Sequence, residues 1–121
     1  MNVAVIIPAL DEERSIGQVV RGMTHPAIRQ MIVGDNGSAD RTNEFAADAG
    51  ADVATIGERG YGAACAGALR LVRPEIDTIL FVDGDGSDDP AEVDLLLAVL
   101  EQVQQLAEHA RDIRAVQIVD D

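Results

Sequence analysis

The sequence predicts an α/β domain built on a mostly parallel sheet. Short apolar, β-prone runs alternate with helical patterns along the chain, which is typical of strand–helix–strand units wound in a right-handed sense. Glycine-rich or acidic loops follow the strand-like runs, where open α/β sheets place their ligands. The 121 residues suit one small domain, and no internal repeat or linker divides them. We therefore expect a single domain over residues 1–121.

The first half is predicted to hold two strands and two helices. A proline closes the first strand, and three acidic residues then open a helix at the positive end of its dipole. His25-Pro26 ends that helix, and Gly50 marks the end of the next one. The predicted strands cover residues 3–7 and 30–33, and the predicted helices run from 11 to the His25-Pro26 stop and over 40–49.

The second half continues the alternation. A weaker strand is followed by a glycine-containing loop and a helix of small residues, then by a strand and a long amphipathic helix. This last helix is expected to carry more apolar area than a short sheet can cover, and so to favour self-association. The predicted strands cover 51–56, 77–82 and 113–119, the helices cover 61–72 and 90–109, and the uncovered apolar residues are Leu95, Leu96, Val99, Leu100 and Val103.

Composition narrows the class of partner. Lys and Arg total 9 against 22 Asp and Glu, which gives a net charge of −13. Such a field repels a phosphate backbone, so nucleic acid is excluded as a partner. No apolar run approaches the length of a membrane span and no signal segment opens the chain, which predicts a cytoplasmic protein. A single cysteine, Cys65, excludes an internal disulfide, and its small neighbours favour a buried packing role.

The strongest chemical signal is an acidic loop after the fourth strand. The apolar run from Thr78 to Val82 ends in four carboxylates within seven positions. Asp83 and Asp85 fall at the carboxyl end of the strand, where their charges repel each other unless a cation lies between them. Mg²⁺ or Mn²⁺ favours such oxygen ligands. The loop therefore predicts a metal site, formed by Asp83 and Asp85, that holds a phosphate.

Three other interpretations of this loop stay open. A solvated turn that starts the next helix explains Asp89, because Asp89-Pro90-Ala91-Glu92 fits an N-cap, but it leaves Asp83 and Asp85 unexplained. A calcium loop of EF-hand spacing has Asp88 where Gly is needed and follows a strand. An Asp-x-Asp-Gly loop of haloacid-dehalogenase phosphatases also binds Mg²⁺, but it normally opens its domain.

The unusual residues gather in four loops at strand ends. The carboxyl ends of parallel strands meet at one edge of a sheet, so these loops should form one ligand crevice. Gly60 and Gly62 would let backbone N–H groups approach an anion beside Arg59, whereas Gly67 fits phosphate contact and close helix packing equally well. The loops are Pro8-Ala9-Leu10-Asp11-Glu12, Asp35-Asn36-Gly37-Ser38, Glu58-Arg59-Gly60-Tyr61-Gly62 and Asp83-Gly84-Asp85.

In their order along the chain, these motifs resemble those of family 2 inverting glycosyltransferases, most closely the dolichyl- or polyprenyl-phosphate sugar transferase group. The resemblance covers residues 3–90 and rests on Val5-Ile6-Ile7-Pro8-Ala9-Leu10-Asp11-Glu12-Glu13, Ile32-Val33-Gly34-Asp35-Asn36-Gly37-Ser38-Ala39-Asp40-Arg41-Thr42, Gly60-Tyr61-Gly62-Ala63-Ala64 and Leu80-Phe81-Val82-Asp83-Gly84-Asp85-Gly86.

The resemblance implies a Rossmann-like GT-A fold that binds a UDP- or GDP-linked sugar through Mg²⁺ or Mn²⁺. Pro8, Leu10 and Glu12 would line the nucleoside pocket, Asp35 would recognise the base, and Asp83 and Asp85 would form the D-x-D pair. The implied nucleotide-sugar site comprises Pro8, Ala9, Leu10, Glu12, Asp35, Gly37, Ser38, Arg59, Gly60, Gly62, Asp83, Gly84 and Asp85.

The chain also departs from the family pattern. Asp11 stands where Asn is usual, and Ser87 replaces a frequent Gln or His. The family's acceptor segment, which carries the catalytic base, is expected after the last helix, and neither Asp120 nor Asp121 matches that base. We thus expect a truncated GT-A domain, the donor-binding half, with no catalytic residue assigned.

Two functional classes remain open on the sequence. In the first, sugar transfer to a polyprenyl phosphate or another hydroxyl acceptor is completed by a partner chain or a homo-oligomer, at the membrane periphery if the acceptor is a lipid. In the second, the chain is a nucleotide-binding module or inactive fragment without transfer activity.

Overall fold

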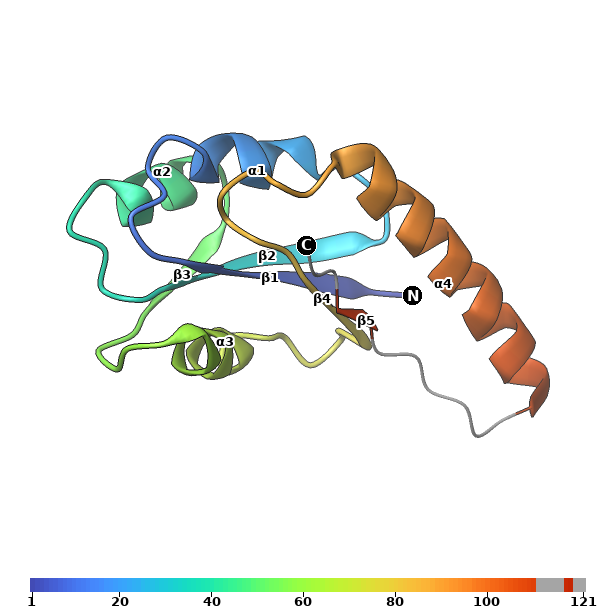
Figure 1. The fold of residues 1–121 in the computed structure, drawn as a ribbon. Helices are drawn as coiled ribbons and strands as arrows, with labels where there is room; N and C mark the ends of the chain where they lie inside the picture. The colour runs from blue at the N-terminus through green and yellow to red at the C-terminus, as the bar shows by residue number, and fades with distance from the viewer. Residues whose placement is uncertain (111–116, 119–121) are drawn as a thin grey trace.

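In the computed structural model, the chain folds into three layers, with a parallel sheet between two layers of helices (Figure 1). The structure describes residues 1–110 and 117–118, with side chains up to Glu108. The five strands lie in the order β3-β2-β1-β4-β5, and each neighbouring pair is parallel. The predicted α/β class with a mostly parallel sheet is thereby confirmed.

The elements alternate along the chain as the sequence predicts. In order, they are β1 (Val3–Ala9), α1 (Ile16–Gly22), β2 (Ile28–Asp35), α2 (Thr42–Asp48), β3 (Asp52–Thr55), α3 (Tyr61–Leu69), β4 (Thr78–Phe81), α4 (Pro90–Ala110) and β5 (Gln117–Ile118). The fifth strand falls within the range predicted for it, whose remaining residues 113–116 and 119 lie outside the described part of the chain.

The central strand β1 explains why the sheet is so apolar. Each residue from Val3 to Ile7 is fully buried, because helices cover both faces of the strand. One face packs against α1, α2 and α4 through residues such as Ile16, Ala46 and Leu97. The opposite face of the sheet packs against α3. Figure 1 shows the same arrangement, with α1 and α2 above the sheet and α3 below it.

The first helix is shorter than predicted. It begins at Ile16 instead of Asp11, and no acidic residue lies in its first turn. Asp11 adopts a left-handed backbone conformation with φ of 53°, which interrupts a helix. Its carboxylate accepts a hydrogen bond from Ala39 N, and Glu12 N donates to Thr42 Oγ1. Contacts with the loop after β2 thus replace the predicted first helical turn.

Helix α3 lies unusually close to the sheet. A Cβ at Gly34 of β2 would be 2.4 Å from the Ala64 carbonyl oxygen, and a Cβ at Gly67 would be 1.9 Å from Cδ1 of Ile56. The space beside Gly67 is thus filled by Ile56, which favours the close-packing interpretation of this glycine over phosphate contact. The helix ends at Leu69, earlier than the predicted 72, because the next residues form tighter turns, including Val72 N to Leu69 O.

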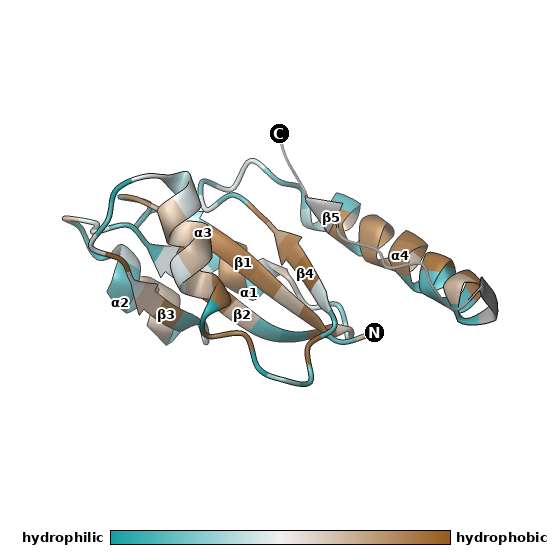
Figure 2. Ribbon diagram, turned by 90° about the horizontal axis from the view of Figure 1, so that it is seen from below, coloured by the Kyte–Doolittle hydropathy of each residue, from teal (hydrophilic) through white to brown (hydrophobic). Residues whose placement is uncertain are grey.

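Helix α4 extends away from the sheet and carries many apolar residues, drawn in brown in Figure 2, several of which are exposed. It buries Val93, Leu97 and Leu100, whereas Leu95 is 66% and Leu106 69% exposed. The predicted uncovered surface is confirmed at Leu95, Val99 and Val103. It is wrong for Leu100, which packs into the core, and Leu96 is partly buried against that core. Across the described residues, no helix is both long and apolar enough to span a membrane.

Candidate functional site

A pocket opens at the carboxyl edge of the sheet, where the sequence predicts a ligand crevice. Its volume is about 260 Å³. The end of β1, the turn after β2, and the β3–α3 loop with the start of α3 form its walls. The lining residues are Pro8, Ala9, Leu10, Asn36, Arg59, Gly60, Tyr61 and Ala64. Of the residues that the sequence predicts for a nucleotide-sugar site, Pro8, Ala9, Leu10, Arg59 and Gly60 line this pocket.

The pocket combines apolar walls with one cation. Leu10 and Tyr61 are large side chains that remain 47% and 57% exposed beside it, which suits a flat ring as ligand. Arg59 is the only charged residue of this lining. The Arg59 side chain forms no hydrogen bond or ion pair with any residue that the structure describes. Its N–H donors can therefore reach an anionic ligand.

The turn after β2 is locked to its neighbours. Asp35 is only 3% exposed, and its Oδ1 accepts a hydrogen bond of 3.0 Å from Ser38 N. Gly37 takes a φ of 79°, a conformation that favours glycine. Ser38 Oγ in turn accepts from Asp11 N at 2.9 Å. Asp35, Gly37 and Ser38 therefore shape the turn beside the pocket, and none of them lines it.

The acidic loop after β4 packs against the same edge. Ser15 Oγ donates a 2.7 Å hydrogen bond to Gly84 O, and a Cβ at Gly84 would lie 3.4 Å from both Ala9 Cβ and Pro8 O. Gly84, between Asp83 and Asp85, is thereby held next to Pro8 and Ala9, which line the pocket. The predicted convergence of the first and fourth strand ends is confirmed.

Within the acidic loop, three carboxylates accept hydrogen bonds from backbone N–H groups. Asp88 Oδ2 accepts from Asp83 N at 2.9 Å, and Asp89 Oδ1 accepts from Ala91 N at 2.9 Å. Asp89 is thus the N-cap of α4, as the sequence predicts. Asp85 Oδ1 accepts from both the N–H and the hydroxyl of Ser87. The helix-start interpretation explains Asp89 but not Asp83 or Asp85.

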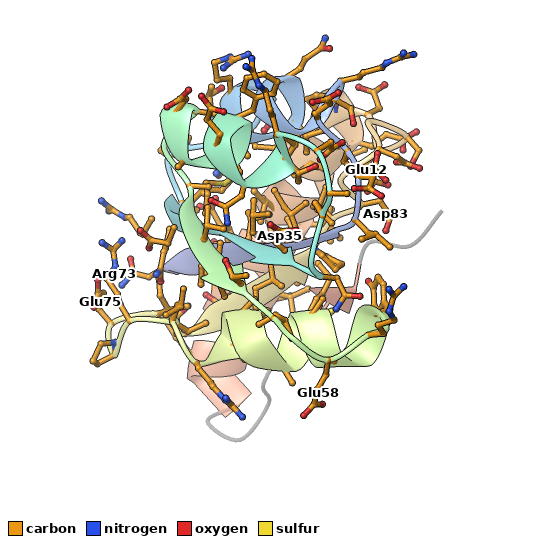
Figure 3. The ribbon with its side chains drawn as sticks, turned by 90° about the vertical axis from the view of Figure 1, so that its left-hand side faces the viewer. Glu12, Asp35, Glu58, Arg73, Glu75 and Asp83 are labelled. Carbon is orange, nitrogen blue, oxygen red and sulfur yellow. The ribbon has the colours of Figure 1, made fainter. Side chains whose placement is uncertain are left out.

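Glu12 places a further carboxylate near Asp85 of the acidic loop. Burial, followed by the charge of Asp85, raises the pKa of Glu12. In Figure 3, Glu12 and Asp83 lie on the same side of the molecule, while Glu58 points away from it. The crowding of like charges around Asp85 is what a bound cation would relieve.

The donor set fits an ion that is shared with a ligand. Within the described ranges, no group of three or more His, Cys, Asp or Glu side chains is arranged to enclose a metal. Mg²⁺ is commonly held by one or two carboxylates together with substrate phosphates and water, and not by an all-protein cage. Asp83 and Asp85 suit that role, whereas the EF-hand interpretation needs a closed set of ligands.

We expect Glu12→Gln to stabilise the ligand-free fold at neutral pH. The folded-state pKa of Glu12 is raised, so its ionised form opposes folding above that pKa, and the effect disappears as pH falls and the carboxylate is protonated. Because the side chain is only partly buried and solvent still screens its charge, the gain should be about 0.5 kcal/mol or less. Urea unfolding at about pH 7 and about pH 3.5 measures it. Glu58→Gln, an exposed site, is the control, and an equal gain there would contradict the local cause.

The site implied by the resemblance omits three lining residues, Asn36, Tyr61 and Ala64, although Asn36 and Tyr61 lie in loops that the sequence predicts to form the crevice. All three lie inside the quoted motifs, so proximity in sequence could have suggested them. Their contact with the pocket, however, depends on how close α3 approaches β2. Conversely, Gly62 belongs to the first turn of α3 and is not part of the lining.

Comparison with known proteins identifies the class to which this fold and site belong. The profile of glycosyl transferase family 2 matches residues 4–114. The chain therefore belongs to glycosyl transferase family 2. This membership favours the glycosyltransferase interpretation of the acidic loop over the phosphatase alternative.

Individual relatives support the assignment. An uncharacterised glycosyltransferase of Mycobacterium tuberculosis is 37% identical over 101 residues, which cover 83% of this chain and 44% of the relative. Glucosyl-3-phosphoglycerate synthase of the same organism, solved with Mn²⁺, UDP and glucosyl-3-phosphoglycerate, superposes with a TM-score of 0.68 at 28% identity, covering 82% of this chain and 39% of that one. Mannosyl-3-phosphoglycerate synthase from Rubrobacter xylanophilus gives 0.71 at 28%, covering 84% and 37%.

These matches confirm the GT-A-like fold. The chain spans less than half the length of each of these three relatives.

Proposed function

We propose that this chain binds the nucleotide part of a UDP- or GDP-linked sugar, with Mg²⁺ or Mn²⁺ held by Asp83 and Asp85. The observation that carries the proposal is the position of Pro8 and Ala9, which line the pocket and lie so close to Gly84 of the acidic loop that a Cβ added there would touch both. A nucleoside in the pocket would therefore direct its diphosphate toward the two aspartates.

Different residues of the site would contact different parts of the donor. Leu10 and Tyr61 offer apolar walls to the base, and Arg59 offers its guanidinium to the phosphates. A divalent cation at the aspartate pair would neutralise charge on the departing diphosphate. The structural relatives support this arrangement, because M. tuberculosis glucosyl-3-phosphoglycerate synthase has been solved with both Mn²⁺ and UDP bound.

Calorimetric titration tests the proposal. UDP and GDP are titrated into the chain with Mn²⁺, with Mg²⁺ and with EDTA, and pyrophosphate is titrated in parallel. We expect a nucleoside diphosphate to bind with either metal and to lose most of its affinity with EDTA. Affinity that is the same with and without metal would contradict the metal role.

Asp35 provides a second prediction. The resemblance places it against the base, whereas its buried carboxylate does not line the pocket, and the following variants decide between the two. Asp35→Ala should weaken nucleotide binding by about 1.5–3 kcal/mol and leave pyrophosphate binding nearly unchanged, as expected for a carboxylate that accepts from a base N–H. Asp35→Asn keeps the oxygen that accepts from Ser38 N, and so separates base recognition from support of the turn. Equal losses for nucleotide and pyrophosphate would refute the assignment.

The acceptor is the further part of the proposal. The sequence resemblance favours a polyprenyl phosphate, whereas the structural relatives are a glucosyl-3-phosphoglycerate synthase and a mannosyl-3-phosphoglycerate synthase, whose names point to phosphoglycerate as the acceptor. Both acceptors share a phosphate group. Incubation with UDP-glucose or GDP-mannose and either acceptor distinguishes them.

We expect the isolated 121-residue chain to bind donor without transferring the sugar. No residue after Asp89 matches the family's acceptor base, and general-base catalysis typically contributes about 10²–10⁴-fold. Product analysis by mass spectrometry checks this expectation, with slow donor hydrolysis as the most that should appear. Robust transfer by the purified chain would show that the base lies elsewhere in it.

A further inference from the structure

We propose that Asn36 is a positioning residue that holds the segment Glu58-Arg59-Gly60 in place and thereby sets Arg59 at the pocket. This inference rests on the proposed function in assigning the pocket to a nucleotide. It concerns a residue outside the set implied by the family resemblance, and it is carried by hydrogen bonds within the chain.

The carboxamide of Asn36 grips the loop at two points. Its Nδ2 donates a 2.7 Å hydrogen bond to Glu58 O, and its Oδ1 accepts a 2.9 Å hydrogen bond from Gly60 N. One partner is an acceptor and the other a donor, so the orientation of the amide is fixed by its surroundings. The two bonds lie on either side of Arg59, whose backbone is consequently held from both directions.

The loop has little other support. Glu58, Arg59 and Gly60 are all exposed, and Gly60 has a φ of 111°. Among the described residues, no backbone–backbone hydrogen bond is donated by the N–H groups of 57–59. The next backbone hydrogen bond along the chain runs from Ala64 N to Gly60 O, where α3 starts. Without the Asn36 amide, the segment that carries Arg59 would be tethered at its ends alone.

Asn36 itself is well anchored. Its backbone N–H donates to Ala9 O at 2.9 Å, and the preceding Asp35 O accepts from Ile56 N at 2.8 Å. Asn36 thus extends the β1–β2 ladder by one bond and transmits the rigid position of the sheet to an exposed loop. Because Ala9, Asn36, Arg59 and Gly60 all line the pocket, the clamp joins three of its walls.

A double-mutant cycle tests whether Asn36 acts through Arg59. Asn36→Ala and Arg59→Ala are each expected to weaken UDP or GDP binding about tenfold in the presence of Mn²⁺, because each removes polar contacts worth roughly that factor. The double variant should be little weaker than either single variant, since the second change removes what the first has already disabled. Fully additive losses would overturn the proposal.

The matched control is Asn43→Ala. Asn43 is an exposed asparagine, and its Nδ2 donates a 3.0 Å hydrogen bond to Thr55 Oγ1 at the end of β3, outside the pocket. Its loss should leave nucleotide affinity unchanged. A loss equal to that of Asn36→Ala would show a general structural effect and contradict the proposed role.

Asn36→Asp gives a pH readout that a merely structural role would not. The aspartate keeps the acceptor for Gly60 N but turns an oxygen toward Glu58 O, which is repulsive until the carboxyl is protonated. The ordinary pKa of Asp is about 3.9, and burial against a carbonyl raises it. The affinity gap to the wild type should narrow from about pH 8 to about pH 5, whereas the gap for Asn36→Ala should stay constant. A constant gap for both variants would contradict the clamp.

Amide hydrogen exchange separates failure of this inference from failure of the proposed function. In the ligand-free wild type, Gly60 N–H should exchange more slowly than Arg59 N–H, and Asn36→Ala should remove that protection. If no nucleotide binds with metal, the proposed function fails while the exchange result still decides the clamp. An unprotected Gly60 N–H in the wild type overturns it directly.

Discussion

Asp85→Ala is expected to abolish metal-dependent nucleotide binding. Groups that merely orient a metal ligand typically change affinity 10–100-fold, so removal of a proposed ligand should cost at least about 100-fold. The effect should be large because, among the described residues, no group of three or more His, Cys, Asp or Glu side chains is arranged to hold the ion without a shared ligand. Titration of UDP and GDP with Mn²⁺, as used for the wild type, measures the loss.

Two further variants separate a ligand from a support of the turn. Asp85→Asn retains an oxygen that can accept from Ser87 N and Oγ, but it removes the charge. If Asp85 binds the metal, Asp85→Asn should resemble Asp85→Ala. Asp94→Ala removes an equal charge from an exposed position on α4 and should leave binding intact. If Asp85→Ala binds UDP and GDP with unchanged affinity, the assignment of Asp83 and Asp85 as a D-x-D pair is wrong.

Much of the fold could be predicted from local patterns. The apolar run 3–7 lies in β1, Gly50 ends α2 with a φ of 102°, and Asp89 caps α4. Each is a local rule, in which residue type and backbone conformation are linked within a few positions. The convergence of loops at the carboxyl edge also followed, because it depends on parallel topology alone.

The features that the sequence did not predict depend on contacts between residues that are distant in the sequence. Asp11 and Glu12 have the composition of a helix start, yet hydrogen bonds to Ala39 and Thr42 hold them outside α1. The role of Asn36 likewise depends on Glu58 and Gly60, more than twenty positions away. No periodicity encodes such pairings, so the inner structure of the pocket was less predictable than its place in the fold.

Gly34→Ala is the second change for which we expect a large effect, in this case on stability. The new Cβ would lie 2.4 Å from the Ala64 carbonyl oxygen and 3.0 Å from its carbon. Both are backbone atoms in the middle of α3, so no side-chain rotation can relieve the overlap. The helix must move away from β2, which loosens its packing on the sheet.

The expected cost of Gly34→Ala is about 3 kcal/mol, near the upper end for overpacked cores, and corresponds to a fall in Tm of roughly 10–15 °C. Gly62→Ala is the matched control. It lies in the first turn of the same helix, has no heavy atom within 4 Å of its new Cβ, and should be neutral or gain up to about 1 kcal/mol of helix propensity. Thermal unfolding followed by circular dichroism measures both.

Because Ala64 also lines the pocket, Gly34→Ala should weaken nucleotide binding even below its unfolding temperature. A Gly34→Ala chain as stable as the wild type would mean that α3 does not approach β2 this closely, and the geometry of the pocket would have to be redrawn.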